Sequence, residues 1–448
     1  MSKFTTILSL VISCTLSISW AQNPFIRDQF TADPTARVIG EKVYVFPSHD
    51  IRCAEGVGRG PNWFCMKDYH VFSSENLVDW TDHGMIVDQK DVLWANQEAY
   101  SMWAPDCIEK DGKFYFYYPT IIGDTTKYWR GFGIGVATAD QPEGPYEIEP
   151  EPIKNVRGID PNVFIDKDGQ AYLYWSARKI FVAKLEENML QLASKVDTID
   201  NLPAKGLIEG PFMFERNGKY YLTYPHVENK TERIEYAMGD SPMGPFTVTG
   251  VIMDESPTGC WTNHHSIIEF KDQWYFFYHH NDYSPTFDKN RSIRVDSLSF
   301  NEDGTIRKIE PTLRGVGLTD AFGKIQLDRY SALSETGASI DLLDSADTFQ
   351  GWKTILGTKD SWVQYNSVDF DGKQVRSLEI LAKSSAGGKL QILSGDNNGE
   401  IIAEIKVPKG ESWQTVKVRL KTKPSGTQNL AVKLKANSPV EIDWIRFE

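Results

Sequence analysis

Three acidic residues stand at the start of similar stretches of the chain. Asp33 and Asp160 are each followed by proline and a short apolar run, and Glu209 is followed by Gly-Pro and a comparable run. Two carboxyl groups that face each other across a pocket can hydrolyse a glycosidic bond, because a neutral one protonates the departing oxygen while an ionised one activates water. Such a reaction requires surroundings that separate the pKa values of the two groups.

The residues around each acid suggest how these roles are divided. Glu209 precedes the apolar sequence Gly-Pro-Phe-Met-Phe, which favours its protonated form, so we predict that Glu209 is the general acid and Asp33 the general base. Asp160 would add a third charge that raises the pKa of the acid and orients it. Asp before proline is also common in turns, but turn chemistry does not readily explain three acids at equivalent positions. Direct attack by water places the two catalytic carboxyl groups roughly 6.5–9.5 Å apart, whereas a gap of about 5 Å would indicate a covalent intermediate.

The acids belong to a unit that recurs five times along the chain. Each copy has a polar residue, a short apolar strand, a tight turn and an aromatic-rich strand, which is the pattern of a β-hairpin. The turns are expected at Gly40, Gly112, Gly169, Gly218 and Asp272. A strand–turn–strand unit repeated about every 50 residues is typical of a β-propeller, and we predict five blades. Because blades are arranged radially, equivalent positions from different blades can meet in one axial pocket.

Polar residues in the same register are candidates for substrate binding. His264 or His265 opens the fifth unit, at the place where other units carry acids. Asp106 follows Trp103-Ala-Pro and could either hydrogen-bond a sugar or close the second blade. Arg291 follows the fifth hairpin and could bind a sugar hydroxyl or steer a carboxylate, although it could equally be a cation on a surface loop.

Aromatic residues make up 12% of the chain. Most of these rings are expected to pack propeller strands, but a few could stack on the faces of sugar rings. We select Trp103 and Trp175 for stacking. The net charge of −13 argues against nucleic acid or an anionic membrane as a partner.

The 448 residues are enough for two domains, and the pattern changes after the fifth repeat. A glycine-bearing segment, 311–320, breaks the hairpin pattern and is predicted to be the linker. Beyond it, short alternating strands with turn signals about every ten residues indicate a β-sandwich. We therefore predict an all-β fold, with a five-bladed β-propeller over residues 22–320 followed by a β-sandwich (jelly-roll-like) domain over residues 321–448.

The N-terminal residues 1–21 have the features of an export signal. Lys3 provides the positive charge, an apolar stretch follows, and Ser19-Trp-Ala21 is a small-x-small cleavage site. We expect a secreted or periplasmic protein. The sequence around Cys14 weakly resembles a lipoprotein box, but apolar residues continue past it, which makes a lipid anchor at the outer surface the less favoured alternative.

The chain beyond the signal contains Cys53, Cys65, Cys107 and Cys260. An exported protein can pair its cysteines, and a Cys53–Cys65 bridge is expected, although four cysteines allow three pairings. The spacing of His and Cys does not suggest a metal site.

These motifs give residues 23–315 a resemblance to glycoside hydrolase family 43. The matching stretches are Ala32-Asp33-Pro34, Trp103-Ala-Pro-Asp106, Gly158-Ile-Asp160-Pro161, Glu209-Gly-Pro211 and Asn263-His264. The resemblance implies a five-bladed propeller with an inverting, exo-acting glycosidase activity. It places the base on Asp33, the residue that tunes the acid on Asp160 and the acid on Glu209. It also favours His264 as the central histidine and Arg291 as the pocket arginine.

Within that family the sequence looks most like members that release terminal xylose or arabinofuranose, as in Lys67-Asp-Tyr-His-Val-Phe-Ser and Asp79-Trp-Thr-Asp-His-Gly. We expect an enzyme that removes β-D-xylosyl, and also α-L-arabinofuranosyl, residues from polysaccharides or oligosaccharides without a cofactor. The alternatives are an α-L-arabinofuranosidase acting on side chains of arabinoxylan-like polymers and a carbohydrate-binding propeller without catalysis. A retaining fructan-cleaving enzyme is discounted because its Trp-Met-Asn-Asp-Pro-Asn-Gly opening is missing from the sequence.

The C-terminal part, from about residue 325, is similar to carbohydrate-binding module family 6. The similarity includes Asp360-Ser-Trp-Val-Gln-Tyr365 and Ile442-Asp-Trp-Ile-Arg-Phe447. Such modules often hold a structural calcium ion through an acid in the first strand and another near the end, which correspond to Asp328 and Asp443. The usual first-strand acid is Glu, so Asp328 departs from the pattern.

Overall fold

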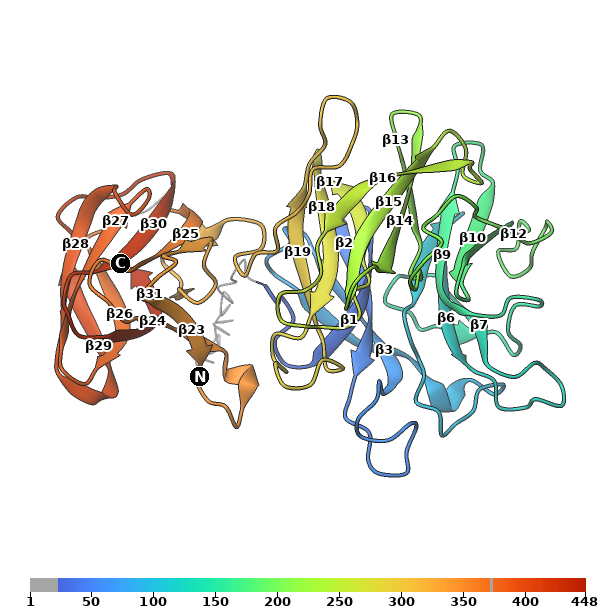
Figure 1. The fold of residues 1–448 in the computed structure, drawn as a ribbon, viewed down its shortest axis with the longest axis horizontal. Coiled ribbons are helices and arrows are strands. Elements are labelled where there is room, and N and C mark those ends of the chain that lie inside the picture. Colours follow the sequence, from blue (N-terminus) through green and yellow to red (C-terminus); the bar gives the residue numbers. More distant parts are fainter. Residues whose placement is uncertain (1–22, 371–373) are drawn as a thin grey trace, which may run out of the picture.

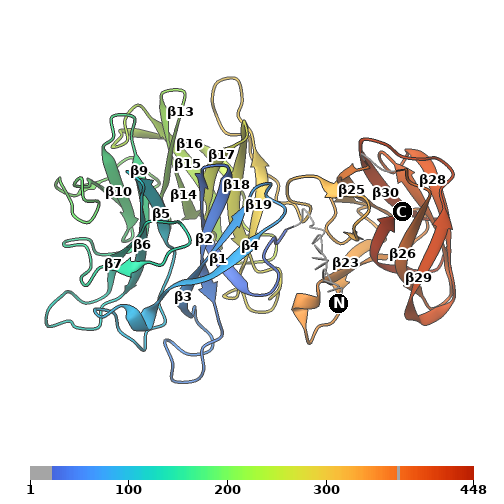
Figure 2. The same cartoon turned by 180° about the vertical axis from the view of Figure 1, so that it is seen from behind.

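The computed structural model describes residues 23–370 and 374–448, and the predicted export signal lies outside them. The described chain is built almost entirely of β-strands, in two bodies that lie side by side (Figure 1; Figure 2). The predicted fold class, a β-propeller followed by a β-sandwich, is confirmed. Within these two ranges, no helix has the length and hydrophobicity of a membrane span.

The first body contains five consecutive sheets, and in each sheet the strands follow one another in chain order. The first sheet consists of β1 (Phe30–Ile39), β2 (Lys42–Asp50), β3 (Met66–Ser74) and β4 (Thr81–Asp88). The second consists of β5 (Asp106–Lys110), β6 (Lys113–Ile121), β7 (Phe132–Ala139) and β8 (Glu147–Ile148). The third consists of β9 (Ile159–Ile165), β10 (Ala171–Ser176), β11 (Ile180–Lys184) and β12 (Asp197–Thr198).

The fourth sheet consists of β13 (Phe212–Arg216), β14 (Lys219–Val227), β15 (Glu232–Gly239) and β16 (Phe246–Met253). The fifth has three strands, β17 (Ser266–Phe270), β18 (Gln273–His280) and β19 (Ser292–Leu298). Each sheet begins with one of the predicted hairpins. The turn residues have the positive φ that tight hairpin turns require, at Gly40, Gly112, Gly169, Gly218 and Asp272.

The sheets close into a ring because apolar side chains fill the space between every pair of neighbours. Separate buried clusters join the first sheet to the second, the second to the third, the third to the fourth and the fourth to the fifth. A further cluster joins the fifth sheet back to the first, with Phe277 of β18 packed among Val43 and Phe72. The side chain of Asn23 adds hydrogen bonds to the backbone of Val295 in β19. The starts of the five sheets therefore surround one axis.

The second body is a sandwich of two sheets around an apolar core. One sheet contains β20 (Thr319–Asp320), β22 (Ala332–Leu333), β25 (Trp362–Asp369), β27 (Gly388–Ser394), β28 (Glu400–Val407) and β30 (Thr427–Leu434). The other contains β21 (Ile325–Gln326), β23 (Ala338–Leu342), β24 (Trp352–Leu356), β26 (Ser377–Ser384), β29 (Gly410–Arg419) and β31 (Val440–Phe447). All strand pairs in these two sheets are antiparallel except the short pair β20–β25. A short 3-10 helix, η2 (Thr348–Gln350), lies between β23 and β24, and another, η1 (Gln89–Asp91), follows β4 in the first body.

Candidate active site

A pocket of about 380 Å³ lies where the sheet starts converge, and it contains all three predicted acids. This volume is at the small end of the range for small-molecule sites, which suits one or two sugar rings better than a long run of polymer. Its lining residues come from all five sheets and their loops and include Asp33, Met66, Trp103, Asp160, Glu209, Glu232, Asn263, His264 and Arg291.

The backbone holds the two aspartates in an unusual conformation. Asp33 in β1 has φ 50° and Asp160 in β9 has φ 55°, in the left-handed region that non-glycine residues seldom adopt. Each residue is 5% exposed, and both line the pocket. Strain of this kind persists where surrounding structure imposes it, and it is common at active sites. The shared conformation shows that the two Asp-Pro motifs are structurally equivalent.

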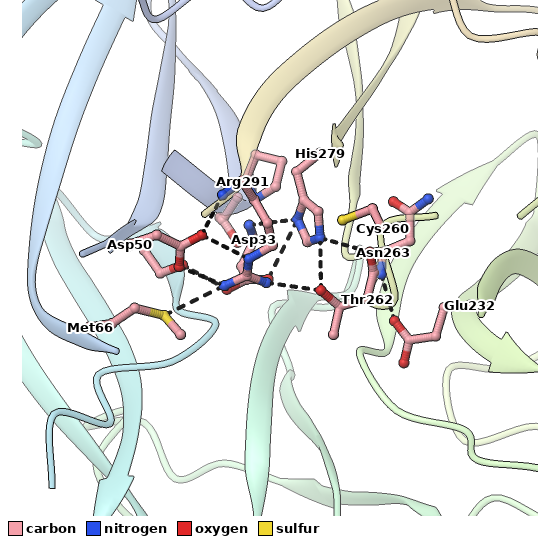
Figure 3. A network of polar contacts seen from close by, with 12 residues as sticks. Asp33, Asp50, Met66, Glu232, Cys260, Thr262, Asn263, His279 and Arg291 are labelled. Atoms are coloured by element: carbon pink, nitrogen blue, oxygen red, sulfur yellow. Dashed lines mark hydrogen bonds and ion pairs between the residues drawn. The ribbon is translucent and has the colours of Figure 1, made fainter. Parts of the chain in front are cut away.

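Asp33 belongs to a buried ionic network (Figure 3). Arg291 donates from Nη1 to Asp33 Oδ1 at 2.8 Å, and from Nε and Nη2 to the two carboxylate oxygens of Asp50 at 2.9 Å. The hydroxyl of Ser48 donates to Asp33 Oδ2 at 2.6 Å. Burial opposes ionisation, but the groups around the carboxylate, led by the Arg291 guanidinium and including the Ser48 hydroxyl, together outweigh it and lower the pKa of Asp33 to about 2. Asp33 is therefore an ionised carboxylate at neutral pH.

His279 contacts the backbone of Asp33. The backbone N–H of Asp33 donates to His279 Nδ1 at 3.0 Å, which requires that nitrogen to be unprotonated. Burial lowers the pKa of His279 well below its ordinary value, in agreement with a neutral ring. The ring therefore fixes the backbone that carries Asp33 without adding a second charge.

Asp160 contacts the loop that carries Glu209. Its Oδ2 accepts the backbone N–H of Gly210 at 3.0 Å, and Gly210 is the residue next to Glu209. Burial and the neighbouring Glu209 raise the pKa of Asp160 well above its ordinary value. Asp160 thus orients Glu209 through the backbone of Gly210. The two carboxyl groups also oppose each other's ionisation.

Glu209 differs from Asp33 in its electrostatic surroundings. Burial raises the pKa of Glu209, and the negative charge of Asp33 raises it further, although Glu232 and Arg291 partly oppose this. The pocket therefore contains one carboxyl group that is easily ionised and another that tends to keep its proton, which is the separation of pKa values that acid–base hydrolysis needs.

Glu232 is a fourth carboxyl group in the pocket and was not predicted from the sequence. It begins β15, is 1% exposed, and accepts the backbone N–H of Asn263 on Oε2 at 2.6 Å (Figure 3). Burial together with the charge of Glu209 raises the pKa of Glu232 well above its ordinary value. Two neighbouring buried carboxyl groups oppose each other's ionisation, so the pair of Glu209 and Glu232 tends to keep a proton.

The other predicted binding residues divide into two groups. Trp103, His264 and Arg291 line the pocket. Burial lowers the pKa of His264 to about 4, so this ring is neutral under ordinary conditions. His265, the alternative to His264, instead lies close to the Thr223 hydroxyl at 2.5 Å and is completely buried.

Asp106 and Trp175 do not reach the pocket. Asp106 forms an ion pair with Arg37 of β1 at 2.6 Å and accepts the backbone N–H of Val163 in β9, so it ties three blades together. Of the two functions considered for it, the structure therefore supports closing the blades. Trp175 is 2% exposed and stacks on Phe181 in the core between the second and third sheets, where no sugar can reach it.

The predicted disulfide between Cys53 and Cys65 is confirmed, with Cα atoms 5.7 Å apart. Cys107 and Cys260 are buried free thiols. The disulfide closes the loop between β2 and β3, and that loop contributes Trp63 and Phe64 to the pocket lining.

The sandwich places Asp328 and Asp443 close enough to influence each other's ionisation. Burial raises the pKa of each to about 6. Both Asp328 oxygens and Asp443 Oδ1 have no hydrogen-bond donor among the described residues, although Arg329 Nε forms an ion pair with Asp328 Oδ2 at 3.0 Å. Two neighbouring carboxylates with buried oxygens that accept no hydrogen bond fit a hard cation such as calcium, which prefers oxygen ligands.

Sequence profiles of two known families match this chain. Residues 21–306 match Glycosyl hydrolases family 43, and residues 333–448 match Carbohydrate binding module (family 6). A curated protein from Humicola insolens, "Xylosidase/arabinosidase 43A", is 36% identical over 336 residues, which cover 64% of this chain and 99% of that protein.

Solved structures give the same result. A β-xylosidase/α-arabinofuranosidase from a compost microbial metagenome, solved with xylotriose in a calcium-free form, is 36% identical with a TM-score of 0.58, covering 65% of this chain and 98% of that one. An arabinoxylan arabinofuranohydrolase from Bacillus subtilis, solved with cellotetraose, is 23% identical with a TM-score of 0.55 and covers 96% of this chain and 99% of that one. This last similarity concerns the fold alone and extends over both domains.

Proposed function

The chain belongs to family 43 of the glycosyl hydrolases, and we propose that it is an inverting, exo-acting glycosidase that removes terminal pentose residues. It is a glycoside hydrolase of the β-xylosidase/α-L-arabinofuranosidase type. We propose β-D-xylosyl units as the main substrate and α-L-arabinofuranosyl units as a second one. The names of the related proteins support both sugars, and the xylotriose bound in a related structure supports xylo-oligosaccharides.

One observation carries the proposed mechanism: an ionised Asp33 and a proton-retaining Glu209 line the same pocket. Asp33 accepts a proton from a water molecule as its oxygen attacks the anomeric carbon. Glu209 donates its proton to the glycosidic oxygen as the bond to the leaving sugar breaks. Because water attacks on the face opposite the leaving group, the product has the inverted configuration.

Asp160 and Arg291 act on these two groups. Asp160 orients the Glu209 loop through Gly210, and the repulsion between the two carboxyl groups opposes their ionising together. Arg291 keeps Asp33 ionised and fixes its direction through contacts to both carboxylate oxygens, at 2.8 and 3.2 Å.

The pocket also contains groups suited to sugar hydroxyls. The amide of Asn263 is completely buried, and neither its oxygen nor its nitrogen has a hydrogen-bond partner among the described residues. The indole N–H of Trp103 is also buried and has no hydrogen-bond partner among the described residues. Buried polar atoms are normally hydrogen-bonded, so these groups are suited to the hydroxyls of a bound pentose.

Two further features remain proposals. The match to a carbohydrate-binding family leads us to propose that the sandwich binds polysaccharide, and that Asp328 and Asp443 hold a structural calcium ion there. Catalysis in the propeller would not involve that ion. The export signal at residues 1–21 is likewise proposed from the sequence alone.

The substrate assignment is tested by comparing initial rates on an aryl β-D-xyloside and the matched aryl α-L-arabinofuranoside. We expect turnover of both, with the xyloside faster. Activity on the arabinofuranoside alone would favour the side-chain-cleaving alternative. Binding of both without product release would favour the non-catalytic alternative.

A further inference from the structure

Two histidines and an aspartate meet on the first sheet, away from the axial pocket. His49 lies in β2, and Asp68 and His70 lie in β3, the strand that pairs with β2 (Figure 1). Each side chain offers one nitrogen or oxygen atom, and these three atoms all lie within 4.8 Å of one another. Asp68 and His70 are two positions apart in one strand, so their side chains point to the same side of the sheet. The two histidines meet only because β2 pairs with β3, which is why their spacing in the sequence did not indicate a metal site.

The separations between these side chains suit one small cation. His49 Nδ1 lies 2.6 Å from Asp68 Oδ1, and the rings of His49 and His70 have centroids 5.3 Å apart with their planes at 68°. Bonds of about 2.0–2.2 Å place neighbouring ligand atoms of one zinc ion roughly 3–3.5 Å apart. A bound ion therefore requires small adjustments of the three side chains and no movement of the strands.

A simple ion pair between His49 and Asp68 does not explain the position of the second histidine. His70 Nδ1 lies 3.3 Å from Asp82 Oδ1 of β4, and the His70 ring stacks on Phe72 with centroids 6.2 Å apart. A carboxylate beside a histidine ring is typical of metal sites, because it orients the ring and sets its tautomer. His70 is thus held in place from outside the cluster while it faces His49 and Asp68.

The cluster is open to solvent on its histidine side. The side chains of His49 and His70 are 21% and 20% exposed, whereas that of Asp68 is 6% exposed, so an ion can enter from water and reach a largely buried carboxylate. One cation is near: Lys67 Nζ lies 3.9 Å from Asp68 Oδ2. The Lys67 side chain is 45% exposed and can turn into the solvent when an ion binds.

We propose that His49, Asp68 and His70 form a binding site for a divalent transition-metal ion of the zinc type, with water completing the coordination. Two imidazole nitrogens and one carboxylate oxygen are ligands that such ions prefer. Calcium instead takes six to eight oxygen ligands, so this site differs in kind from the calcium site proposed in the sandwich.

The place of His49 in β2 indicates what the ion would do. The residue before it, Ser48, donates to Asp33, and the residue after it, Asp50, accepts from Arg291. Successive side chains of a strand point to opposite faces, so the ion holds β2 from the face opposite to the base. The ion stabilises the first sheet and takes no part in hydrolysis. The site does not depend on the proposed glycosidase function.

The test is a calorimetric titration of zinc chloride into the full chain without an affinity tag. The protein is first stripped with EDTA and then kept in excess calcium, which occupies oxygen-ligand sites. We expect one equivalent of zinc to bind the wild type, and its Kd to be at least about tenfold weaker in His49→Ala and in His70→Ala. Loss of a ligand should cost no less than loss of an orienting partner, which typically costs 10–100-fold.

His83→Ala is the matched control. His83 is another histidine of the same sheet, in β4, where it lies 2.8 Å from the Ser73 hydroxyl and outside the cluster. It should bind zinc as the wild type does. Wild-type protein that binds no zinc would overturn the site, and so would equal affinity in the wild type and the two cluster variants. An equal weakening by His83→Ala would show unspecific binding and overturn it as well.

Thermal unfolding gives a second readout that is independent of activity. A ligand that binds only the folded state raises its stability, so zinc should raise the unfolding temperature of the wild type and of His83→Ala. It should leave the double variant His49→Ala/His70→Ala unchanged. If a histidine variant does not fold in EDTA, Asp68→Asn, which keeps the size of the side chain, must show the same loss of zinc binding. Wild-type zinc affinity in a folded Asp68→Asn protein would contradict the site.

Discussion

Replacing Asp33 with Asn should lower kcat/KM by about 10²–10⁴-fold on every glycoside tested, whatever its leaving group, because this is the usual contribution of a positioned general base. The amide cannot accept a proton from water, and no other described carboxyl group combines a place in the pocket with a pKa lowered to about 2. Because the folded-state pKa of Asp33 lies below its ordinary value, the base stays ionised down to about pH 2. Kinetics on an activated aryl xyloside and on xylobiose measure the loss.

The control for Asp33→Asn must exclude a general collapse of the pocket, because Arg291 loses one of its two carboxylate partners. Arg291 keeps three hydrogen bonds to Asp50, which should hold the guanidinium in place. The variant should therefore unfold at nearly the wild-type temperature and still bind xylotriose. A folded, binding-competent Asp33→Asn protein with more than about a tenth of wild-type kcat/KM would place the base elsewhere, given the size of the expected loss.

Replacing Glu209 with Ala should have an effect that depends on the leaving group. On xylobiose, whose leaving oxygen needs a proton, kcat/KM should fall about 10²–10⁴-fold. On an aryl xyloside with a strongly acidic phenol the departing oxygen is stable without protonation, so much of the activity should remain. The alkaline limb of the pH profile should also disappear, because the group that must keep its proton is gone. Equal losses on both substrates would show that Glu209 is not the proton donor.

Glu232→Gln is the matched control for this experiment, because it changes the neighbouring carboxyl group and leaves the acid in place. The amide oxygen can still accept the N–H of Asn263, and the neutral amide resembles a protonated carboxyl group. Because burial and the charge of Glu209 raise the pKa of Glu232 well above its ordinary value, this substitution replaces one neutral group by another, and the alkaline limb of kcat/KM should stay near its wild-type pH. A clear movement of that limb to lower pH would show that an ionised Glu232 holds the proton on Glu209 by its charge, which would contradict this account.

The proposed catalytic acids could be located from the sequence because each stands in a repeated motif. Asp33 and Asp160 precede proline at matching places in two hairpins, and the structure gives them nearly the same backbone conformation. A repeat implies radial equivalence, so their convergence in one pocket follows from the hairpin pattern. The five hairpin turns were predictable for the same reason, because a tight turn requires residues that accept positive φ.

The residues that sequence analysis missed have no such motif. Asp50 and Glu232 are single acids at the end of β2 and the start of β15, and only the packing of one blade against another brings them to Arg291 and Glu209. A carboxylate in an ordinary strand gives no sign of which inter-blade partner it will meet.

Two residues predicted to bind substrate, Trp175 and Asp106, lie outside the pocket for a related reason. Trp175 belongs to a strand in which all six residues are buried, so the hydrophobic pattern does not show which face points to the axis. Asp106 follows the Trp-Ala-Pro motif directly, yet the bond to Arg37 of another blade turns it into the core. Trp63 illustrates the reverse case, since the cysteine spacing predicts the closed loop but not the direction of the ring.

The stereochemistry of the first product tests the central claim most directly, because inversion requires an ionised base and a protonated acid acting together on one bond. Proton NMR of an aryl β-D-xyloside during the first minutes of hydrolysis distinguishes the two anomers of xylose before they interconvert. We predict that α-xylose appears first and that β-xylose accumulates only later. Initial formation of β-xylose would show retention through a covalent intermediate and would contradict the assignment of Asp33 as general base.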